Sequence, residues 1–367
     1  MITIKHPIEF PNTYPLDRIG PLKDLLFFDI ETTGFSGETS QLYLIGCTYF
    51  DGFGWKLIQW FADTRQAEKE LLDAFFEFLK RFKILIHFNG DRFDIPYLLK
   101  CCERLGLDYH FDDLISIDIF KKIKPYRKLL KLENMKQKSI EQFLGIARTD
   151  KYNGGQLIEV YKDYLMTHEQ NLYDLLILHN EDDLKGMPSI LPILNYPDFL
   201  EHPFTLSDQE IVDEPDANGH FRHLLKLTCK SFCSIPVPVK ASMAPARCTM
   251  EKDQITFFVE LTEGTLKHFY PDYKDYYYLP FEDRAVHKSI GSCVDKDARV
   301  KATAASCYTK TTGFFLPQFE DIWEPVMKQE YKDKMRYAAL GDVYLSDQAA
   351  LQKYTNAILA YVNYIGN

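Results

Sequence analysis

The chain has 367 residues, of which 46% are hydrophobic and 26% charged, and its formal net charge is −10 at pH 7. Such values are ordinary for a globular protein with a sizeable core, and they exclude a uniformly cationic nucleic-acid coat protein. A local basic groove can still bind nucleic acid on an acidic protein, so nucleic-acid binding stays open.

No apolar run reaches the length of a transmembrane helix, and the N-terminus lacks the apolar core of a signal peptide. The eight cysteines are scattered along the chain and complete no zinc-binding pattern with histidines. We therefore expect free thiols, a cytoplasmic location and no membrane association.

Residues 1–21 are expected to form an extended lead-in, because Pro7, Pro11, Pro15 and Pro21 interrupt any helix. Residues 22–198 are expected to form the first domain, in which meandering strands precede alternating helices and strands. Its strands are predicted at 25–30, 43–50, 55–61, 84–89 and 114–120, and its helices at 67–80, 95–106, 138–145, 158–164 and 172–184. This order predicts an α/β fold with a mixed five-stranded sheet flanked by helices.

Residues 205–367 have a different pattern, which predicts a β-rich α+β domain with terminal helices. Strands are predicted at 223–233, 253–261, 265–270, 276–280, 291–294 and 313–318, and the chain is expected to be helical from about residue 321. The stretch 287–301 is basic and lies close in sequence to the tyrosines at 276–278, a mixture that nucleic-acid grooves use. Positioning of nucleic acid and a solvated domain edge both remain open for it.

Two acidic residues end the first predicted strand of the first domain. Side chains alternate between the faces of a strand, so Asp29 and Glu31 are expected on one face and Ile30 on the other. Neighbouring carboxylates repel each other unless a cation lies between them, and Mg²⁺ or Mn²⁺ prefer such oxygen ligands. A strand that ends in a solvated acidic turn is the alternative.

Further acidic residues follow in order along the chain. Asp94 comes just after a predicted strand, and His179 and Asp183 are four residues apart on a predicted helix, so they share a face. Two metal ions about 3.5–4 Å apart need about four carboxylates and a group that orients water. Asp29, Glu31, Asp94 and Asp183 supply the carboxylates, and His179 is the candidate general base because imidazole titrates near neutral pH.

The motifs at 29–31 (DIE), 89–94 (NGDRFD) and 179–183 (HNEDD) resemble, in this order, the three motifs of the DEDD, or DnaQ-like, 3′–5′ exonucleases. Within that superfamily the layout is most similar to the YprB-type predicted RNase H-like exonucleases, whose linking segments residues 138–146 and 152–161 resemble. The resemblance covers residues 22–195 and implies a ribonuclease H-like fold. It also implies hydrolysis of phosphodiester bonds at single-stranded 3′ ends of DNA or RNA, with two divalent cations, Mg²⁺ or Mn²⁺.

One position departs from the family pattern. Tyrosine-type relatives have Tyr, three residues and then Asp, whereas histidine-type relatives have His, four residues and then Asp. In this chain His179 and Asp183 have the tyrosine-type spacing, and Leu184 stands where the histidine-type spacing needs an acid. Asp183 is therefore the expected fourth ligand, with Asp182 elsewhere on the helix.

Substrate-binding residues are expected beside the acidic motifs. Thr32 and Thr33 would donate hydrogen bonds to the terminal nucleotide, and Asn89 would contact that nucleotide or orient Asp94. Phe93 and Phe35 would stack on bases, although a place in the core is favoured for Phe93, because it precedes a helix expected to be buried.

Other residues near the motifs have two interpretations each. Asp118 would either support the site or be a surface acid, and the basic segment 121–128 would either bind phosphates or form a solvated loop. His87 is expected to be a core histidine with satisfied hydrogen bonds. Two other functions stay open for the whole chain: an inactive RNase H-like module that binds nucleic acid or a protein, and a proofreading subunit that needs a polymerase partner.

Overall fold

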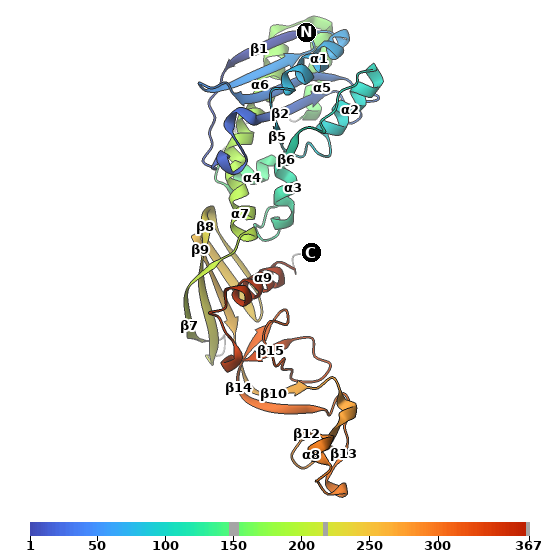
Figure 1. Ribbon diagram of the computed structural model, residues 1–367. Helices are drawn as coiled ribbons and strands as arrows, with labels where there is room; N and C mark the ends of the chain where they lie inside the picture. The colour runs from blue at the N-terminus through green and yellow to red at the C-terminus, as the bar shows by residue number, and fades with distance from the viewer. Residues whose placement is uncertain (147–153, 216–218, 365–367) are drawn as a thin grey trace. The chain divides into compact units, whose positions relative to one another are not determined.

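A computed structural model describes residues 1–146, 154–215 and 219–364, and the chain divides into two compact units, 1–198 and 199–367 (Figure 1). Unit 1 contains a six-stranded mixed sheet with the strand order β1-β4-β3-β2-β5-β6. Strands β1 to β4 pair antiparallel, and β2, β5 and β6 pair parallel. The strands are β1 (Ile2–Pro7), β2 (Leu25–Thr32), β3 (Leu42–Phe50), β4 (Trp55–Phe61), β5 (Ile84–His87) and β6 (Ile115–Asp118).

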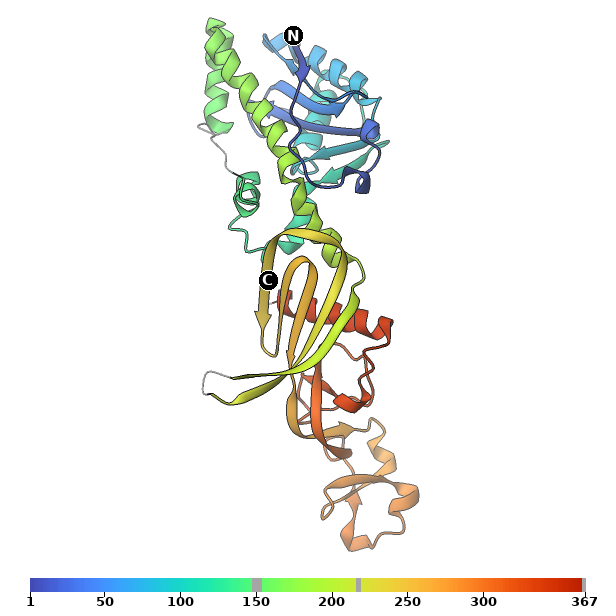
Figure 2. The ribbon, with the colours of Figure 1, turned by 90° about the vertical axis from the view of Figure 1, so that its left-hand side faces the viewer.

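Helices flank this sheet, so the predicted α/β fold is confirmed for unit 1. Figure 2 shows the long helix α6 beside the sheet. The helices that begin within unit 1 are α1 (Glu68–Leu79), α2 (Asp94–Leu105), α3 (Ile119–Ile123), α4 (Gln137–Phe143), α5 (Gly154–Thr167), α6 (Gln170–Ile190) and α7 (Asn195–Glu201).

The sheet has six strands where the sequence analysis predicted five, because residues 2–7 are not a lead-in but the edge strand β1. This strand pairs along β4, from Ile2 opposite Phe61 to Pro7 opposite Lys56. Prolines exclude a helix, but an edge strand tolerates a proline at its end. The alternation of Ile2 and Ile4 with polar residues was the signal for a strand.

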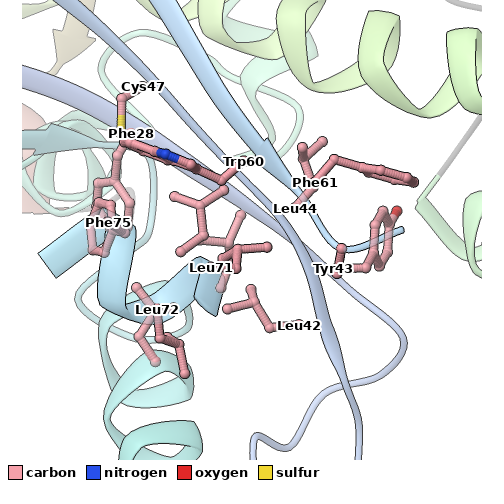
Figure 3. Close-up of a cluster of buried hydrophobic side chains, with 14 of the residues drawn as sticks. Phe28, Leu42, Tyr43, Leu44, Cys47, Trp60, Phe61, Leu71, Leu72 and Phe75 are labelled. Carbon is pink, nitrogen blue, oxygen red and sulfur yellow. The ribbon is translucent and has the colours of Figure 1, made fainter. Parts of the chain in front are cut away.

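Helix α1 packs against one face of the sheet and fixes which side chains of β2 enter the core. Its buried residues Leu71, Leu72 and Phe75 meet Phe28 and Trp60, as Figure 3 shows. The ring centroids of Phe28 and Phe75 are 5.8 Å apart. Because successive side chains of β2 alternate, Phe28 and Ile30 face α1, and Asp29 and Glu31 face the opposite side.

Unit 2 is rich in β-structure, as the sequence predicted, and its strands form three three-stranded sheets. The first sheet carries the terminal helix α9 (Gln348–Tyr364), which packs against β8 and β9. The sheets are β7 (Thr205–Pro215), β8 (Phe221–Met243) and β9 (Ala246–Glu260); β10 (Thr262–Phe269), β14 (Tyr308–Gln318) and β15 (Arg336–Ala339); and β11 (Tyr276–Leu279), β12 (Arg284–His287) and β13 (Val300–Lys301).

Two local predictions for unit 2 were wrong, and one long strand was not predicted. Residues 321–347 are not helical, because they contain β15, a 3-10 turn and the helix-breaking Pro325 and Gly341. The predicted strand at 291–294 lies at the end of the short helix α8 (Lys288–Gly291), whose first turn is capped by the His287 side chain. Strand β7 was missed, because its central residues are mostly polar and exposed.

Among the described residues, no helix is both long and apolar enough to cross a membrane. All eight cysteines are free thiols, as predicted, and seven of them are buried.

Candidate active site

Strand β2 and helix α6 bring two of the predicted motifs together. The Nε2 atom of His179 lies 3.6 Å from Glu31 Oε1 and 3.4 Å from Asp183 Oδ2. One ligand atom from each of these three residues lies within 4.8 Å of the others. Two carboxylates and an imidazole at this spacing form a donor set that suits a divalent transition metal such as Mn²⁺.

The third motif reaches the same place from the start of α2. Asp94 is buried, with 6% of its surface exposed, and its carboxylate accepts hydrogen bonds from its own backbone N–H and from that of Ile30. Since Ile30 lies between Asp29 and Glu31 on β2, the Asp94 carboxylate lies beside both. The structure thus brings all four predicted acids and His179 together.

Crowding and burial disfavour the ionised state of Asp29, Glu31 and Asp94. Burial raises the pKa of Asp29 well above its usual range, and the charges of Asp183, Glu31 and Asp94 raise it further. Burial together with the Asp183 charge raises the pKa of Glu31 to about 8, and burial is the main cause that raises the pKa of Asp94 to about 7. A bound divalent cation would reverse the electrostatic cost, because it favours the ionised carboxylates.

Two neutral side chains contact the acids and were missed by the sequence analysis. The Asn180 Nδ2 group donates a hydrogen bond of 2.9 Å to Asp29 Oδ2, and the Tyr43 hydroxyl donates one of 3.4 Å to Glu31 Oε2. The Tyr43 ring is stacked on Tyr161 with centroids 4.3 Å apart. A signal for Asn180 existed, because it belongs to a stripe of α6 whose other members, such as Leu184, are buried and apolar.

The predicted substrate-binding threonines shape the turn after β2. The Thr32 hydroxyl donates a hydrogen bond of 2.7 Å to the carbonyl of Gly34. Thr33 pairs with Gln41 twice: its hydroxyl oxygen accepts from the Gln41 N–H at 2.8 Å, and its own N–H donates to the Gln41 carbonyl at 2.9 Å. Contact of either threonine with a nucleotide stays a prediction.

An aromatic pair lies next to the acidic cluster. Phe93 immediately precedes α2 and is half-buried, and its ring lies 6.3 Å from that of Phe35, centroid to centroid. Phe35 is 93% exposed. An aromatic ring so exposed and braced by a second ring is suited to stack on a nucleobase, which leaves the predicted role of Phe93 open.

Asp118 stabilises the loop that precedes Asp94. It is buried at the end of β6, and its carboxylate accepts hydrogen bonds from the N–H groups of Asn89 at 2.9 Å and Asp91 at 3.3 Å. Asn89 has a positive φ of 66°, which the surrounding bonds stabilise. The structure therefore favours the interpretation in which Asp118 supports the site over the one in which it is a surface acid.

His87 is a satisfied buried histidine, as expected. Its Nδ1 accepts a hydrogen bond from the Gly90 N–H at 3.0 Å, and its Nε2 lies 2.8 Å from the Ser116 hydroxyl. Gly90 leaves room for this contact, because a Cβ there would lie 2.6 Å from His87 Nδ1.

Several cations of the predicted basic segments have partners within the protein. Lys121 pairs with Asp91 at 2.9 Å, and the Arg127 guanidinium donates to the carbonyl of Glu133 at 2.7 Å. In unit 2, Lys310 pairs with Asp283, and Arg299 lies 4.6 Å above the Tyr277 ring. These contacts favour structural roles for those four cations.

Part of unit 1 is similar to a known family and to known proteins. A family model described as the RNase H superfamily matches residues 26–195 and confirms the predicted RNase H-like fold. A DNA polymerase of Thermococcus kodakarensis is 31% identical over 120 residues, which make up 29% of this chain and 7% of the polymerase. The chain spans less than a fifth of the length of these polymerases. The matched region makes up 7% of the polymerase of Thermococcus kodakarensis and 15% of that of Pyrococcus glycovorans.

Two solved structures are similar in part. The family B DNA polymerase from the archaeon Pyrobaculum calidifontis is 15% identical with a TM-score of 0.40, and the similarity covers 48% of this chain and 25% of that one. The zinc-bound complex of E. coli ExoI with single-stranded DNA is 14% identical with a TM-score of 0.27, covering 57% of this chain and 55% of that one.

Proposed function

We propose that the chain is a metal-dependent 3′–5′ exonuclease that hydrolyses phosphodiester bonds at the 3′ end of a nucleic-acid strand, a proposal in line with the match of residues 26–195 to the RNase H superfamily model. The observation that carries the proposal is the convergence of Asp29, Glu31, Asp94 and Asp183 with His179 at one end of β2. Carboxylates with strongly raised pKa values at one place are a signature of a functional site.

The donor chemistry of this cluster fits two divalent cations. Asp29, Glu31, Asp94 and Asp183 would hold them, since hard oxygen ligands suit Mg²⁺ and Mn²⁺. Such ions, when bound, lower the pKa of a water and offset the charge that develops on the leaving 3′-oxygen. His179, whose Nε2 lies 3.6 Å from Glu31 Oε1 and 3.4 Å from Asp183 Oδ2, would take the proton of the attacking water.

The substrate is a single-stranded 3′ end. The exposed Phe35 ring, braced by Phe93, would stack on a base near that end, and Asn89 is placed in the loop just before Asp94 to contact the terminal nucleotide. Base stacking does not discriminate between DNA and RNA, so both are candidate substrates.

A direct assay tests this function. The purified chain is incubated with Mn²⁺ or Mg²⁺ and with 5′-labelled and 3′-labelled single-stranded DNA and RNA. We expect labelled mononucleotides from the 3′ label, progressive shortening of the 5′-labelled strand, and no reaction in EDTA. A circular single strand should stay intact, which separates an exonuclease from an endonuclease. Binding of the strands without any cleavage would overturn the proposal in favour of an inactive binding module.

Replacing His179 by alanine is expected to lower the turnover number by about 10²- to 10⁴-fold, because general-base catalysis contributes about that factor. The measurement is the rate of mononucleotide release at saturating substrate and Mn²⁺. His110→Ala, which changes an exposed histidine of the same unit, should keep the wild-type rate.

The Mn²⁺ dependence of His179→Ala separates two roles for this histidine. If His179 is the base, the apparent dissociation constant for Mn²⁺ stays close to that of the wild type. If it is a metal ligand together with Glu31 and Asp183, that constant rises and high Mn²⁺ restores much of the rate. An unchanged rate at every Mn²⁺ concentration would exclude both roles.

A further inference from the structure

A pair of buried amides lies behind the acidic cluster, on the side of the sheet that α6 covers. Asn180 is completely buried on α6, and Gln59 is completely buried on β4. Gln59 Nε2 donates a hydrogen bond of 2.9 Å to Asn180 Oδ1, and Asn180 Nδ2 donates one of 2.9 Å to Asp29 Oδ2. The two amides thus form a hydrogen-bonded chain that ends on a predicted metal ligand.

These hydrogen bonds can run in only one direction, from Gln59 to Asn180 and from Asn180 to Asp29. Gln59 Nε2 also donates to the Ile177 carbonyl at 3.0 Å, so both hydrogens of this amide are engaged. Turning the Gln59 amide over would set its oxygen against two other oxygens. In the observed orientation this oxygen, Oε1, is buried and has no hydrogen-bond partner among the described residues, but both amide hydrogens are bonded. With its oxygen held by Gln59, Asn180 can present only its N–H group to Asp29.

A glycine provides the space for this arrangement. Gly46 on β3 lies directly between Asp29 on β2 and Gln59 on β4 in the register of the sheet. A Cβ atom at position 46 would lie 1.9 Å from Asn180 Oδ1 and 2.5 Å from Leu184 Cδ1. Only glycine at position 46 leaves room for the Asn180 side chain to lie over β3, where it bonds to Asp29 on β2 and to Gln59 on β4.

We propose that Asn180, oriented by Gln59, is a positioning residue that fixes the Asp29 carboxylate for metal binding, an inference that rests on the proposed nuclease function. The Asn180 N–H group occupies Oδ2 of Asp29 and stabilises its charged form. The other carboxylate oxygen of Asp29 would then be left to bind a metal ion together with the neighbouring acids, whose charges act on Asp29. Partners of this kind, which orient a ligand without touching the metal, typically change metal affinity by about 10- to 100-fold when they are lost.

The test is a calorimetric titration of the full-length metal-free chain with Mn²⁺, alongside the nuclease assay. Asn180→Ala is expected to raise the dissociation constant for Mn²⁺ by about 10- to 100-fold. Gln59→Met removes the two donors but keeps the length of the side chain, and it should raise that constant by a smaller factor, because Asn180 can then turn over. Both variants should regain part of their nuclease rate at high Mn²⁺.

A double-mutant cycle separates positioning from mere packing. If Gln59 acts through Asn180, the change Gln59→Met adds nothing on the Asn180→Ala background. Thr48→Val is the matched control: Thr48 is buried on β3, two residues from Gly46, and its hydroxyl has no partner among the described residues. This variant should bind Mn²⁺ like the wild type.

The outcomes separate this inference from the proposed function. Wild-type affinity for Mn²⁺ in both amide variants, or additive effects in the cycle, would overturn the positioning role even in an active nuclease. A wild-type chain that binds Mn²⁺ but cleaves no strand would overturn the proposed function, whereas weaker Mn²⁺ binding by Asn180→Ala would still support the positioning. If Asn180→Ala fails to fold, as judged by thermal unfolding, the dissociation constant of Gln59→Met for Mn²⁺ alone decides whether the positioning role holds.

Discussion

Replacing Asp29 with asparagine is expected to lower the rate of nucleotide release by at least about 10³-fold, while the chain stays folded. The asparagine loses the negative charge that a cation requires. Because Asn180 presents its N–H group to position 29, the oxygen of the new amide would turn toward Asn180, and its NH₂ group would face the metal site. The substitution therefore places a donor where a ligand is needed.

Asp29→Asn should also make the metal-free chain more stable, because it removes a buried carboxyl group surrounded by Glu31, Asp94 and Asp183. The measurements are the nuclease rate with Mn²⁺ and the thermal unfolding midpoint in EDTA. Glu77→Gln, at an exposed position of α1, is the control and should change neither. A rate within tenfold of the wild type would remove Asp29 from the proposed metal site.

Without divalent cations, the free energy of unfolding is expected to fall as the pH rises from about 4.5 to about 8. The pKa of Glu31 is raised to about 8 and that of Asp94 to about 7, whereas the unfolded carboxyls titrate near 4.5 and 3.8. In this window the folded chain holds protons that the unfolded chain has released, so a rising pH favours unfolding. Each such group contributes a slope of about 1.4 kcal/mol per pH unit.

Urea unfolding at pH 5.5 and pH 8, in EDTA and in Mn²⁺, measures this linkage. The loss of stability at pH 8 should appear in EDTA and be reversed by Mn²⁺, since the ion binds the ionised carboxylates of the folded chain. Glu31→Gln should flatten the dependence in EDTA. A stability in EDTA that is constant or rises between these pH values would contradict the burial of these acids in the metal-free protein.

The acids of the site could be predicted because each depends on a local rule. The period of two along β2 placed Asp29 and Glu31 on one face, and the helical spacing of four placed His179 beside Asp183. Asp94 followed from its position just after a strand, where the chain turns into α2. Rules of this kind need only a few neighbouring residues.

The contacts of the supporting groups could not be predicted, because their partners are distant in the chain. Gln59 and Asn180 are 121 positions apart, and they meet only through the register of the sheet and the placement of α6. Tyr43 reaches Glu31 from a neighbouring strand in the same way. Strand β1 was missed for a different reason: its local alternation was present, but Pro7 and the prolines that follow it favoured an irregular segment.

The glycine at position 46 leads to a prediction about the sequences of related proteins. The contact distances at Gly46 mean that a residue with a side chain there cannot coexist with an amide at 180 in its present place. A relative that keeps the four acids but has alanine or a larger residue at the equivalent position must move the helix equivalent to α6 outward or carry a smaller residue in place of Asn180. Substitutions at positions 46, 59 and 180 should therefore occur together, and a change at one of them alone would mark a site whose acids no longer bind metal in the same way.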